Sequence, residues 1–345
     1  MASAFAEIFG QEHSVAWLRQ AYLADRLPHG LIFAGPAGVG KATTARALAK
    51  LFLCEQPKSD EPCDRCESCR VFDAGNHPDY HVITKELIRY HDKTGKSKGI
   101  DLSIHVIRPE LLEPASRKPV MGRGKVFVVE QADLMNPQAQ NALLKTLEEP
   151  AGRAVIILLT DQPGCLLPTI RSRCQLVRFA ALDPKRVQKE LQKRGKDATT
   201  AANAAALSRG SLGSALKWID EGVIPFAQEL IGQMDRLISG ARADDLPAWF
   251  RRAADAYAEK QLERDELASK DQATREGLTL YLTLAGEHVR RALAGQDDPQ
   301  RIEPLCGIID SLAEAESYLD ANVSIPLIFQ NLAAQLEQRA TVVRQ

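Results

Sequence analysis

The sequence predicts a parallel α/β core built around a phosphate-binding loop, followed by a region made only of helices. Three observations lead to this prediction. Short apolar runs alternate with helical segments in the first half of the chain, a glycine-rich loop follows the first of these runs, and strand signals vanish after Asp183-Pro184. Continuous apolar runs of this kind are typical of parallel strands that are covered on both faces.

The predicted strands are short and apolar, at residues 31–34, 125–130, 154–160 and 175–179. A helix over 42–52 directly follows the glycine-rich loop. A second helix is expected after Asn136, which can cap it, with Pro137 at its first position and Pro150 as its stop. The spacing of its apolar side chains predicts one buried face: Ala139, Ala142, Leu143 and Leu147.

The chain has 345 residues, which is long for one hydrophobic core. We expect a core at 1–181 with a cysteine module at about 54–69, three short helices at 182–221, and a larger helical domain at 222–345. The net charge of −1 excludes a global basic field for nucleic acid. No apolar run has the length of a membrane span, and the first residues do not resemble a secretory signal. A cytoplasmic protein without a membrane partner is expected.

The glycine-rich segment has the spacing of a P-loop. Gly35 and Gly40 are separated by four residues that include Gly38, and Lys41 follows. Backbone N–H groups of such a loop surround phosphate oxygens, while the helix N-terminus and the lysine add positive charge. Because the loop lies between a strand and a helix, the sequence predicts P-loop geometry.

The groups that make such a loop catalytic are missing. Ala42 stands where a Ser or Thr hydroxyl would bind magnesium, and Thr43 points about 100° away around the helix. Glu130-Gln131 ends the second strand, and an amide such as Gln131 cannot accept a proton from water. We interpret the loop as a degenerate nucleotide site, with ATP or ADP binding left open. The alternative is an active ATPase in which Thr43 or water replaces the hydroxyl and Glu130 serves the metal.

Four of the seven cysteines lie close together in the sequence. Cys54, Cys63, Cys66 and Cys69 form a C-x8-C-x2-C-x2-C pattern, which is typical of four thiolates around one structural zinc ion. An iron–sulfur cluster and free thiols are the alternatives. Arg65 and Arg70 flank the module and could offset its negative charge. The remaining cysteines, at 165, 174 and 306, are expected to be packed thiols.

Several separate segments together resemble the AAA+ clamp-loader subunits of bacterial DNA polymerase III. Residues 141–150 (NALLKTLEEP) and 169–174 (TIRSRC) are similar to two family motifs, and residues 8–11 (IFGQ) are similar to its adenine-side segment. The cysteine module also follows the P-loop helix as in that family. The resemblance covers about residues 8–220 and implies an AAA+ core, a helical lid at 182–221 and a collar domain at 222–345.

The resemblance implies that Arg173 is an arginine finger that reaches ATP on a neighbouring subunit. The alternative is an ordinary surface arginine. Thr160 falls at the family's sensor 1 position, and Gly213 stands where a motor subunit has a sensor arginine. With Ala42 and Gln131, this pattern predicts a non-hydrolysing, stator-like component of the DNA-directed DNA polymerase complex that helps load the sliding clamp onto primed DNA during replication.

The partners that this resemblance implies are the delta and tau/gamma subunits, the sliding clamp and primer–template DNA. Two other functions stay open at this point. One is an active tau/gamma-like motor subunit, which the intact Gly40-Lys41 pair would favour. The other is a zinc-dependent nucleic-acid-binding protein, against which the near-neutral charge and the missing aromatic and basic stripe argue.

Overall fold

The computed structural model describes residues 4–91, 101–121, 123–241, 245–264, 269–321 and 323–343. The short basic, glycine-containing stretch at 93–98 lies outside these residues. The chain forms two compact units, one of residues 1–187 with 209–214 and the other of residues 188–208 with 215–345. The predicted domain boundaries at 181 and 221 stay a prediction.

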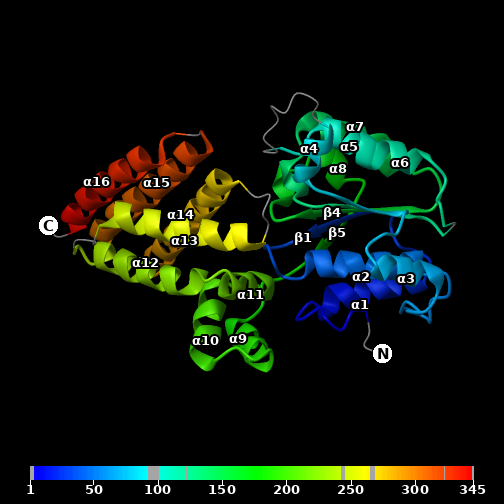
Figure 1. Cartoon of the computed structure of the whole chain (residues 1–345), viewed down its shortest axis with the longest axis horizontal. Helices are drawn as coiled ribbons and strands as arrows, with labels where there is room; N and C mark the ends of the chain where they lie inside the picture. Colours follow the sequence, from blue (N-terminus) through cyan, green and yellow to red (C-terminus); the bar gives the residue numbers. More distant parts are fainter. Residues whose placement is uncertain are drawn as a thin grey trace. The chain divides into compact units, whose positions relative to one another are not determined.

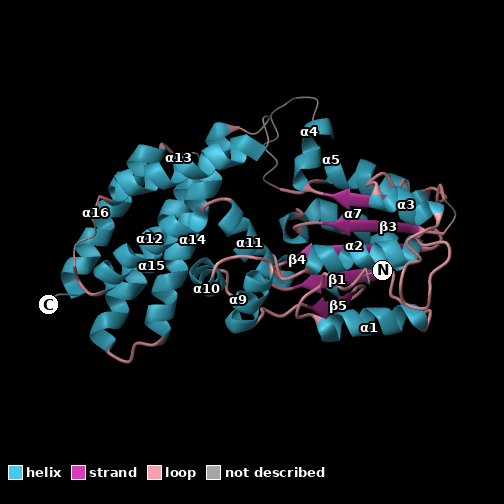
Figure 2. Cartoon of the chain, turned by 60° about the horizontal axis from the view of Figure 1, so that its bottom comes forward, coloured by secondary structure: helices cyan, strands magenta, loops and turns pink. Residues whose placement is uncertain are grey.

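The first unit alternates strands and helices around one parallel sheet (Figures 1 and 2). Its strands, within the described residues, are β1 (Gly30–Ala34), β2 (Tyr80–Ile83), β3 (Lys125–Val129), β4 (Ala154–Thr160) and β5 (Gln175–Arg178). Their order across the sheet is β2-β3-β4-β1-β5. Its helices are α1 (Glu12–Leu23), α2 (Lys41–Leu53), α3 (Glu67–Asp73), α4 (Ile88–His91), α5 (Ile104–Ile107), α6 (Glu113–Ser116), α7 (Pro137–Glu148) and α8 (Pro168–Arg171). Four short helical turns join them, at η1 (Lys85–Leu87), η2 (Arg108–Leu112), η3 (Ala132–Leu134) and η4 (Pro163–Cys165).

Alternate residues of each central strand enter opposite halves of the core. Val126 and Val128 of β3 pack with α1 and α2, whereas Phe127 and Val129 pack with α5, α6 and α7. The period of two follows from the pleat of a strand. Because helices cover both faces (Figure 2), every residue of β1, β3 and β4 is buried. The predicted fold class is confirmed.

The four strands and two helices predicted for this unit are present, and one strand was not predicted. Strands at 31–34, 125–130, 154–160 and 175–179 correspond to β1, β3, β4 and β5, with ends shifted by at most one residue. Strand β2 was missed, because only one of its four residues is buried and its sequence lacks a continuous apolar run. Asn136 caps α7 as predicted, since its Oδ1 accepts a hydrogen bond from the N–H of Ala139 at 2.9 Å.

The second unit consists of helices throughout its described residues. They are α9 (Pro184–Lys193), α10 (Ala198–Leu207), α11 (Leu212–Asp220), α12 (Val223–Ile238), α13 (Leu246–Arg264), α14 (Lys270–Ala294), α15 (Pro299–Asp320) and α16 (Ile325–Val343), with the ends of α9 and α11 in the first unit. Helix α14 packs against α12, α13 and α15, and α16 packs against α13 and α15. None of the described helices is long and apolar enough to span a membrane.

The packing of α7 on the sheet gives a stability prediction. Leu143 is fully buried in the core between α7 and the sheet. We expect Leu143→Ala to lower the free energy of unfolding by about 2–5 kcal/mol, because it removes buried methyl groups and leaves a cavity. Urea unfolding followed by circular dichroism measures this change. Asn141→Ala, at an exposed position of the same helix, is the control and should change the free energy little.

Candidate functional site

The phosphate loop joins β1 to α2 and is closed around its own lysine. The Nζ of Lys41 donates hydrogen bonds to the carbonyl oxygens of Gly35 and Pro36, the latter at 2.8 Å. It also forms an ion pair with Asp161, at 2.6 Å from Oδ1. An ammonium group has three donors, and these contacts use all of them. The Lys41 side chain is accordingly only 8% exposed.

Strand order explains why Asp161 is the residue that pairs with Lys41. Strand β4 lies directly beside β1, and Ala34 pairs in register with Thr160. Both strands are parallel, so the residues that follow them meet at the same edge of the sheet. Glu130 follows β3, which is separated from β1 by β4. The assignment of Glu130 to the phosphate site stays a prediction. Asp161 was not predicted, because the order of strands cannot be read from the sequence.

A pair of glycines brings the segment 209–214 against the phosphate loop. The N–H of Gly213 donates to the carbonyl oxygen of Gly38 at 2.9 Å. A Cβ on Gly213 would lie 2.8 Å from that oxygen, and one on Gly38 would lie 2.3 Å from the Oγ of Ser211. Gly38 also has a φ of +69°, which side chains other than glycine rarely adopt. An arginine at position 213 would therefore clash with the loop.

The α2 hydroxyl groups nearest the loop belong to the second and third residues after Lys41 and not to the first. Ala42 and Thr43 both lie exposed in the first turn of α2. The buried hydroxyl of Thr44 donates to the carbonyl oxygen of Gly40 at 2.8 Å and is used within the helix. Gly40 itself has a φ of +104° and begins α2 in the left-handed region. The glycine positions thus have loop geometry, while the position that follows Lys41 carries no oxygen ligand.

The groups at the ends of β3 and β4 are engaged with each other. The Thr160 hydroxyl donates to Oδ1 of Asp133 at 2.6 Å and accepts a hydrogen bond from the N–H of Gln162. Burial, together with the charge of Glu86, raises the pKa of Glu130 above its usual range. Gln131 is exposed, with a left-handed φ of +49°. This edge of the sheet therefore presents a carboxyl with weakened acidity and an amide, and neither contacts Lys41 in the described interactions.

The four predicted metal-ligating cysteines converge. Cys54 caps the end of α2, Cys63 lies in the following loop, Cys66 caps the start of α3, and Cys69 lies within that helix. Their sulfur atoms all lie within 4.8 Å of one another, and all four residues are buried. Four thiolates around one zinc ion would have their sulfur atoms about 3.8 Å apart. The cluster is therefore a candidate metal site with the predicted ligands.

Backbone N–H groups make this cluster suitable for thiolates. The N–H groups of Cys63, Cys66 and Cys69 point at the sulfur atoms of Cys54, Cys63 and Cys66, at 3.3 to 3.4 Å. Burial alone would raise the pKa of Cys63, but hydrogen bonds from backbone N–H groups and from neighbouring thiols lower it to about 6. Burial raises the pKa values of Cys54 and Cys69. The hydrogen bonds thus favour the thiolate form of Cys63, while burial disfavours the thiolate forms of Cys54 and Cys69.

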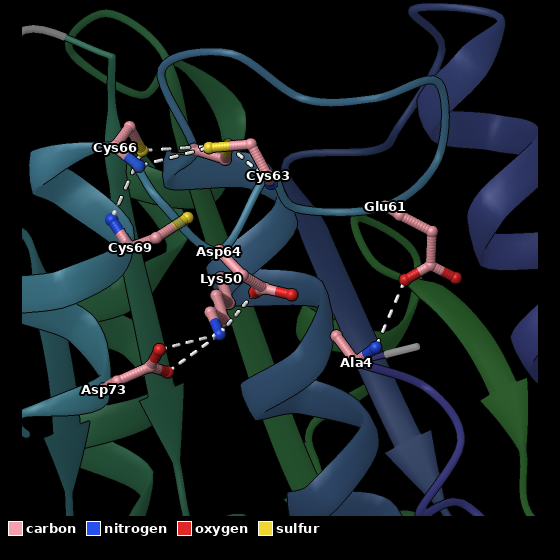
Figure 3. A network of polar contacts seen from close by, with 9 residues as sticks. Ala4, Lys50, Glu61, Cys63, Asp64, Cys66, Cys69 and Asp73 are labelled. Atoms are coloured by element: carbon pink, nitrogen blue, oxygen red, sulfur yellow. Dashed lines mark hydrogen bonds and ion pairs between the residues drawn. The ribbon is translucent and has the colours of Figure 1, made fainter. Parts of the chain in front are cut away.

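Ion pairs hold the cysteine module on the first unit (Figure 3). Lys50 of α2 pairs with Asp64, which lies between the cysteines, and with Asp73 at the end of α3, at 2.7 and 2.8 Å. The Nε of Arg123 donates to the carbonyl oxygen of Cys54 at 2.9 Å. Arg65 and Arg70, which could offset the negative charge of the cysteine module, are exposed. Arg123 was missed because it is far away in the sequence.

The predicted finger, Arg173, lies between α8 and β5 and pairs within its own unit. Its Nε donates to Oε1 of Glu148 at 2.6 Å, and its Nη2 donates to the same oxygen. Its Nη1 donates to the carbonyl oxygen of Thr169 at 3.1 Å. The side chain is 34% exposed. Cys174, which follows it, is partly buried, and burial raises its pKa to about 12.

Arg173 and the phosphate loop lie at opposite edges of the sheet. Strand β5 begins just after Arg173 and runs parallel to β1, with Leu31 beside Gln175 and Ala34 beside Arg178. Arg173 therefore lies at the edge where these strands begin, and Lys41 at the edge where β1 ends. A strand of five residues separates the two edges by about 15 Å. The structure thus unites the loop residues with one another and the cysteines with one another, but separates Arg173 from both Lys41 and Glu130.

Comparison with known proteins adds the family. The profile of the family described as "DNA polymerase III, delta subunit" matches residues 10–183, about half of the chain. DNA polymerase III subunit delta′ of Bacillus subtilis is 36% identical over 167 residues, which are 48% of this chain and 46% of that protein. DNA polymerase III subunit tau/gamma of Haemophilus influenzae is 35% identical over 187 residues, 54% of this chain and 25% of that protein. The matches thus span a quarter to about half of these curated relatives.

Among solved structures, a DNA polymerase III gamma subunit-related protein from Thermotoga maritima superposes with a TM-score of 0.42 and 18% identity, covering 95% of this chain and all of that one. The profile match extends over the P-loop, the cysteine cluster, α7 and Arg173, which are the features of the first unit described above. The chain therefore belongs to the DNA polymerase III delta-subunit family of clamp-loader proteins.

Proposed function

We propose that the chain is the delta′-type, stator-like subunit of a DNA polymerase III clamp loader. In this function it hydrolyses no ATP and supplies Arg173 to ATP that is bound by a neighbouring motor subunit. Its partners are the delta and tau/gamma subunits, and the complex loads the sliding clamp onto primer–template DNA. The matches to both delta′ and tau/gamma proteins support membership in such a complex.

The position of Arg173 is the observation that carries this proposal. Because Arg173 and Lys41 lie at opposite edges of one sheet, Arg173 cannot reach a phosphate held by its own loop. A guanidinium is always charged and stabilises the negative charge of a phosphoryl group in transfer. An arginine so placed can act only on a nucleotide that another molecule binds.

The chemistry of the chain's own phosphate loop supports the same proposal. Hydrolysis needs a hydroxyl for magnesium and a group that orients or deprotonates water. Ala42 provides no hydroxyl, and Gln131 provides no base. Lys41 is already neutralised by Asp161, and the Gly38–Gly213 contact leaves no room for a sensor arginine.

A motor subunit is the second candidate function. The tau/gamma relatives favour it, since proteins of that name are 35% and 38% identical to this chain over 187 and 183 residues. The intact glycines and Lys41 are also compatible with nucleotide binding. The altered residues after Lys41 and at 130–131 argue against hydrolysis.

We infer that the four clustered cysteines hold a structural zinc ion. The donor set fits, since zinc is bound by four thiolates in closed sites, and the four sulfur atoms already lie within 4.8 Å of one another. A bound zinc ion would supply the positive charge that keeps four buried thiols deprotonated. Such a closed site has no open position for a substrate, so its contribution is to the stability of the module.

The first prediction concerns the isolated chain. With ATP and magnesium, its steady-state turnover should equal that of Lys41→Ala, because neither a magnesium ligand nor a general base is present. A coupled phosphate-release assay measures both rates. Turnover that depends on Lys41 would contradict the stator function and favour the motor subunit.

The second prediction concerns the reconstituted loader with its motor and delta subunits, the clamp and primed DNA. Arg173→Ala should lower single-turnover hydrolysis at the adjacent motor site by roughly a thousandfold, the usual effect of losing an arginine finger. Arg173→Lys should not restore it, since a point charge lacks the planar fork. Arg171→Ala, an exposed arginine of the same motif, is the matched control. Unchanged hydrolysis by Arg173→Ala would disprove the finger.

The third prediction concerns the metal. Elemental analysis of the purified chain should find about one zinc ion per chain. Cys66→Ser should lose the zinc and lower the unfolding temperature, whereas Cys165→Ser, at an exposed cysteine outside the cluster, should keep it. Iron with visible absorbance would identify an iron–sulfur centre instead, and a metal-free chain with four reactive thiols would contradict any metal site.

A further inference from the structure

The guanidinium of Arg173 is held by the carboxylate of Glu148, which lies in the segment 141–150. Glu148 is the last residue of α7, and its Oε1 accepts hydrogen bonds from both Nε and Nη2 of Arg173. The carbonyl oxygen of Thr169 accepts from Nη1. Glu148 and Arg173 are 25 residues apart in the sequence. The pair can form because α8 packs against α7.

These contacts leave part of the guanidinium available. Arginine carries five N–H donors, and the described contacts use three of them. One N–H on Nη1 and one on Nη2 are then left to donate. Two such groups on adjacent nitrogens can bind two oxygens of one phosphate. Glu148 and Thr169 thus fix the plane of the guanidinium and leave its terminal nitrogens with donors for a phosphate.

The backbone at Arg173 is closely packed, and the segment before α8 is hydrogen-bonded to α7. A Cβ on Gly30 of β1 would lie 2.9 Å from the Sγ of Cys174 and 3.2 Å from the carbonyl oxygen of Arg173. Buried Gln140 of α7 accepts from the N–H of Leu167 at 2.7 Å and donates to the carbonyl oxygen of Met135. Gln140 therefore ties the residue before α8 to the start of α7 without involving Arg173.

Stability does not account for Glu148. The side chains of Glu148 and Arg173 are 48% and 34% exposed, and ion pairs that exposed contribute little to folding. A carboxylate at the C-terminus of a helix is also disfavoured by the helix dipole. A carboxylate at this place, with two hydrogen bonds to one guanidinium, is better explained by what it does to Arg173.

We propose that Glu148 is a positioning residue for Arg173. It holds the guanidinium in the orientation in which the terminal N–H groups meet the phosphate of the neighbouring subunit. The inference rests on the proposed function of Arg173, since a positioning residue needs a finger to position. Glu148 contacts no nucleotide in this proposal and acts only through Arg173.

The isolated chain tests the pair without any partner. In wild type, the Nε–H of Arg173 should give a ¹⁵N-edited NMR signal with slowed exchange against water, because it is hydrogen-bonded; Arg173→Lys assigns the signal. Glu148→Ala should speed this exchange, and Glu149→Ala, the neighbouring exposed carboxylate, should leave it unchanged. Equal exchange in wild type and Glu148→Ala would overturn the proposal.

The reconstituted loader tests the consequence. Glu148→Ala should lower the kcat of the adjacent motor site by roughly ten- to a hundredfold, as expected for a misplaced catalytic group, with the KM for ATP unchanged. Glu148→Gln, which keeps an oxygen acceptor, should recover part of the loss. In the Arg173→Ala background, Glu148→Ala should cause no further loss.

The outcomes separate the two proposals. If Arg173→Ala has no effect, the finger itself is refuted. If Arg173→Ala lowers kcat but Glu148→Ala does not, only the positioning role is refuted. A higher kcat in Glu148→Ala also overturns it, because the carboxylate would then restrain the arginine instead of presenting it.

Discussion

The parallel pairing of β1 with both β4 and β5 determines where the phosphate loop, Asp161 and Arg173 lie in the first unit. The pairing with β4 brings Asp161 to the loop that follows β1, so that a carboxylate meets Lys41. The pairing with β5 puts the residues before β5 at the opposite edge, where Arg173 lies. Since the strands are parallel, one edge of the sheet collects the residues that follow them and the other edge those that precede them. The position of β1 between β4 and β5 thus makes the phosphate loop and the arginine two separate sites.

The phosphate loop keeps its shape through contacts that do not involve a nucleotide. In its usual use, such a loop directs N–H groups and a lysine at phosphate oxygens. Here Asp161 and two backbone carbonyls accept from the lysine, and Gly213 donates to Gly38. Buried ammonium groups need such partners, because an unpaired charge in the interior is very costly. Internal partners therefore explain how the loop geometry is kept while the catalytic groups around it are absent.

The cysteine module and the contact that holds Arg173 both depend on the ends of core helices. Cys54 ends α2, the helix that follows the phosphate loop, and Glu148 ends α7. Both helices pack on the sheet with apolar faces, and this packing fixes the positions of their ends. Ion pairs from Lys50 and a hydrogen bond from Arg123 attach the cysteine module to the core. Gln140 of α7 accepts a hydrogen bond from Leu167, just before α8. In each case a polar side chain on a rigid element orients the functional group.

The sequence by itself determined the local features of this protein. Apolar runs predicted β1, β3, β4 and β5, Asn136 and Pro137 predicted the start of α7, and spacing predicted the glycine loop and the four cysteines. These features depend on neighbours in the chain, where period, capping and turn chemistry act. The missing hydroxyl at Ala42 and the missing base at Gln131 likewise follow from residue identity alone. Strand β2 was beyond this kind of inference, because it is short and mostly unburied.

Only the tertiary structure decided which distant groups meet. The pairs Lys41–Asp161, Gly38–Gly213, Arg123–Cys54 and Arg173–Glu148 join residues that the sequence separates by 25 to 175 positions. Strand order and helix packing bring them together, and neither leaves a local pattern in the chain. The sequence therefore predicted Lys41 and Arg173 as functional residues. Their carboxylate partners, Asp161 and Glu148, are identified only by the tertiary structure, because strand order and helix packing bring them close.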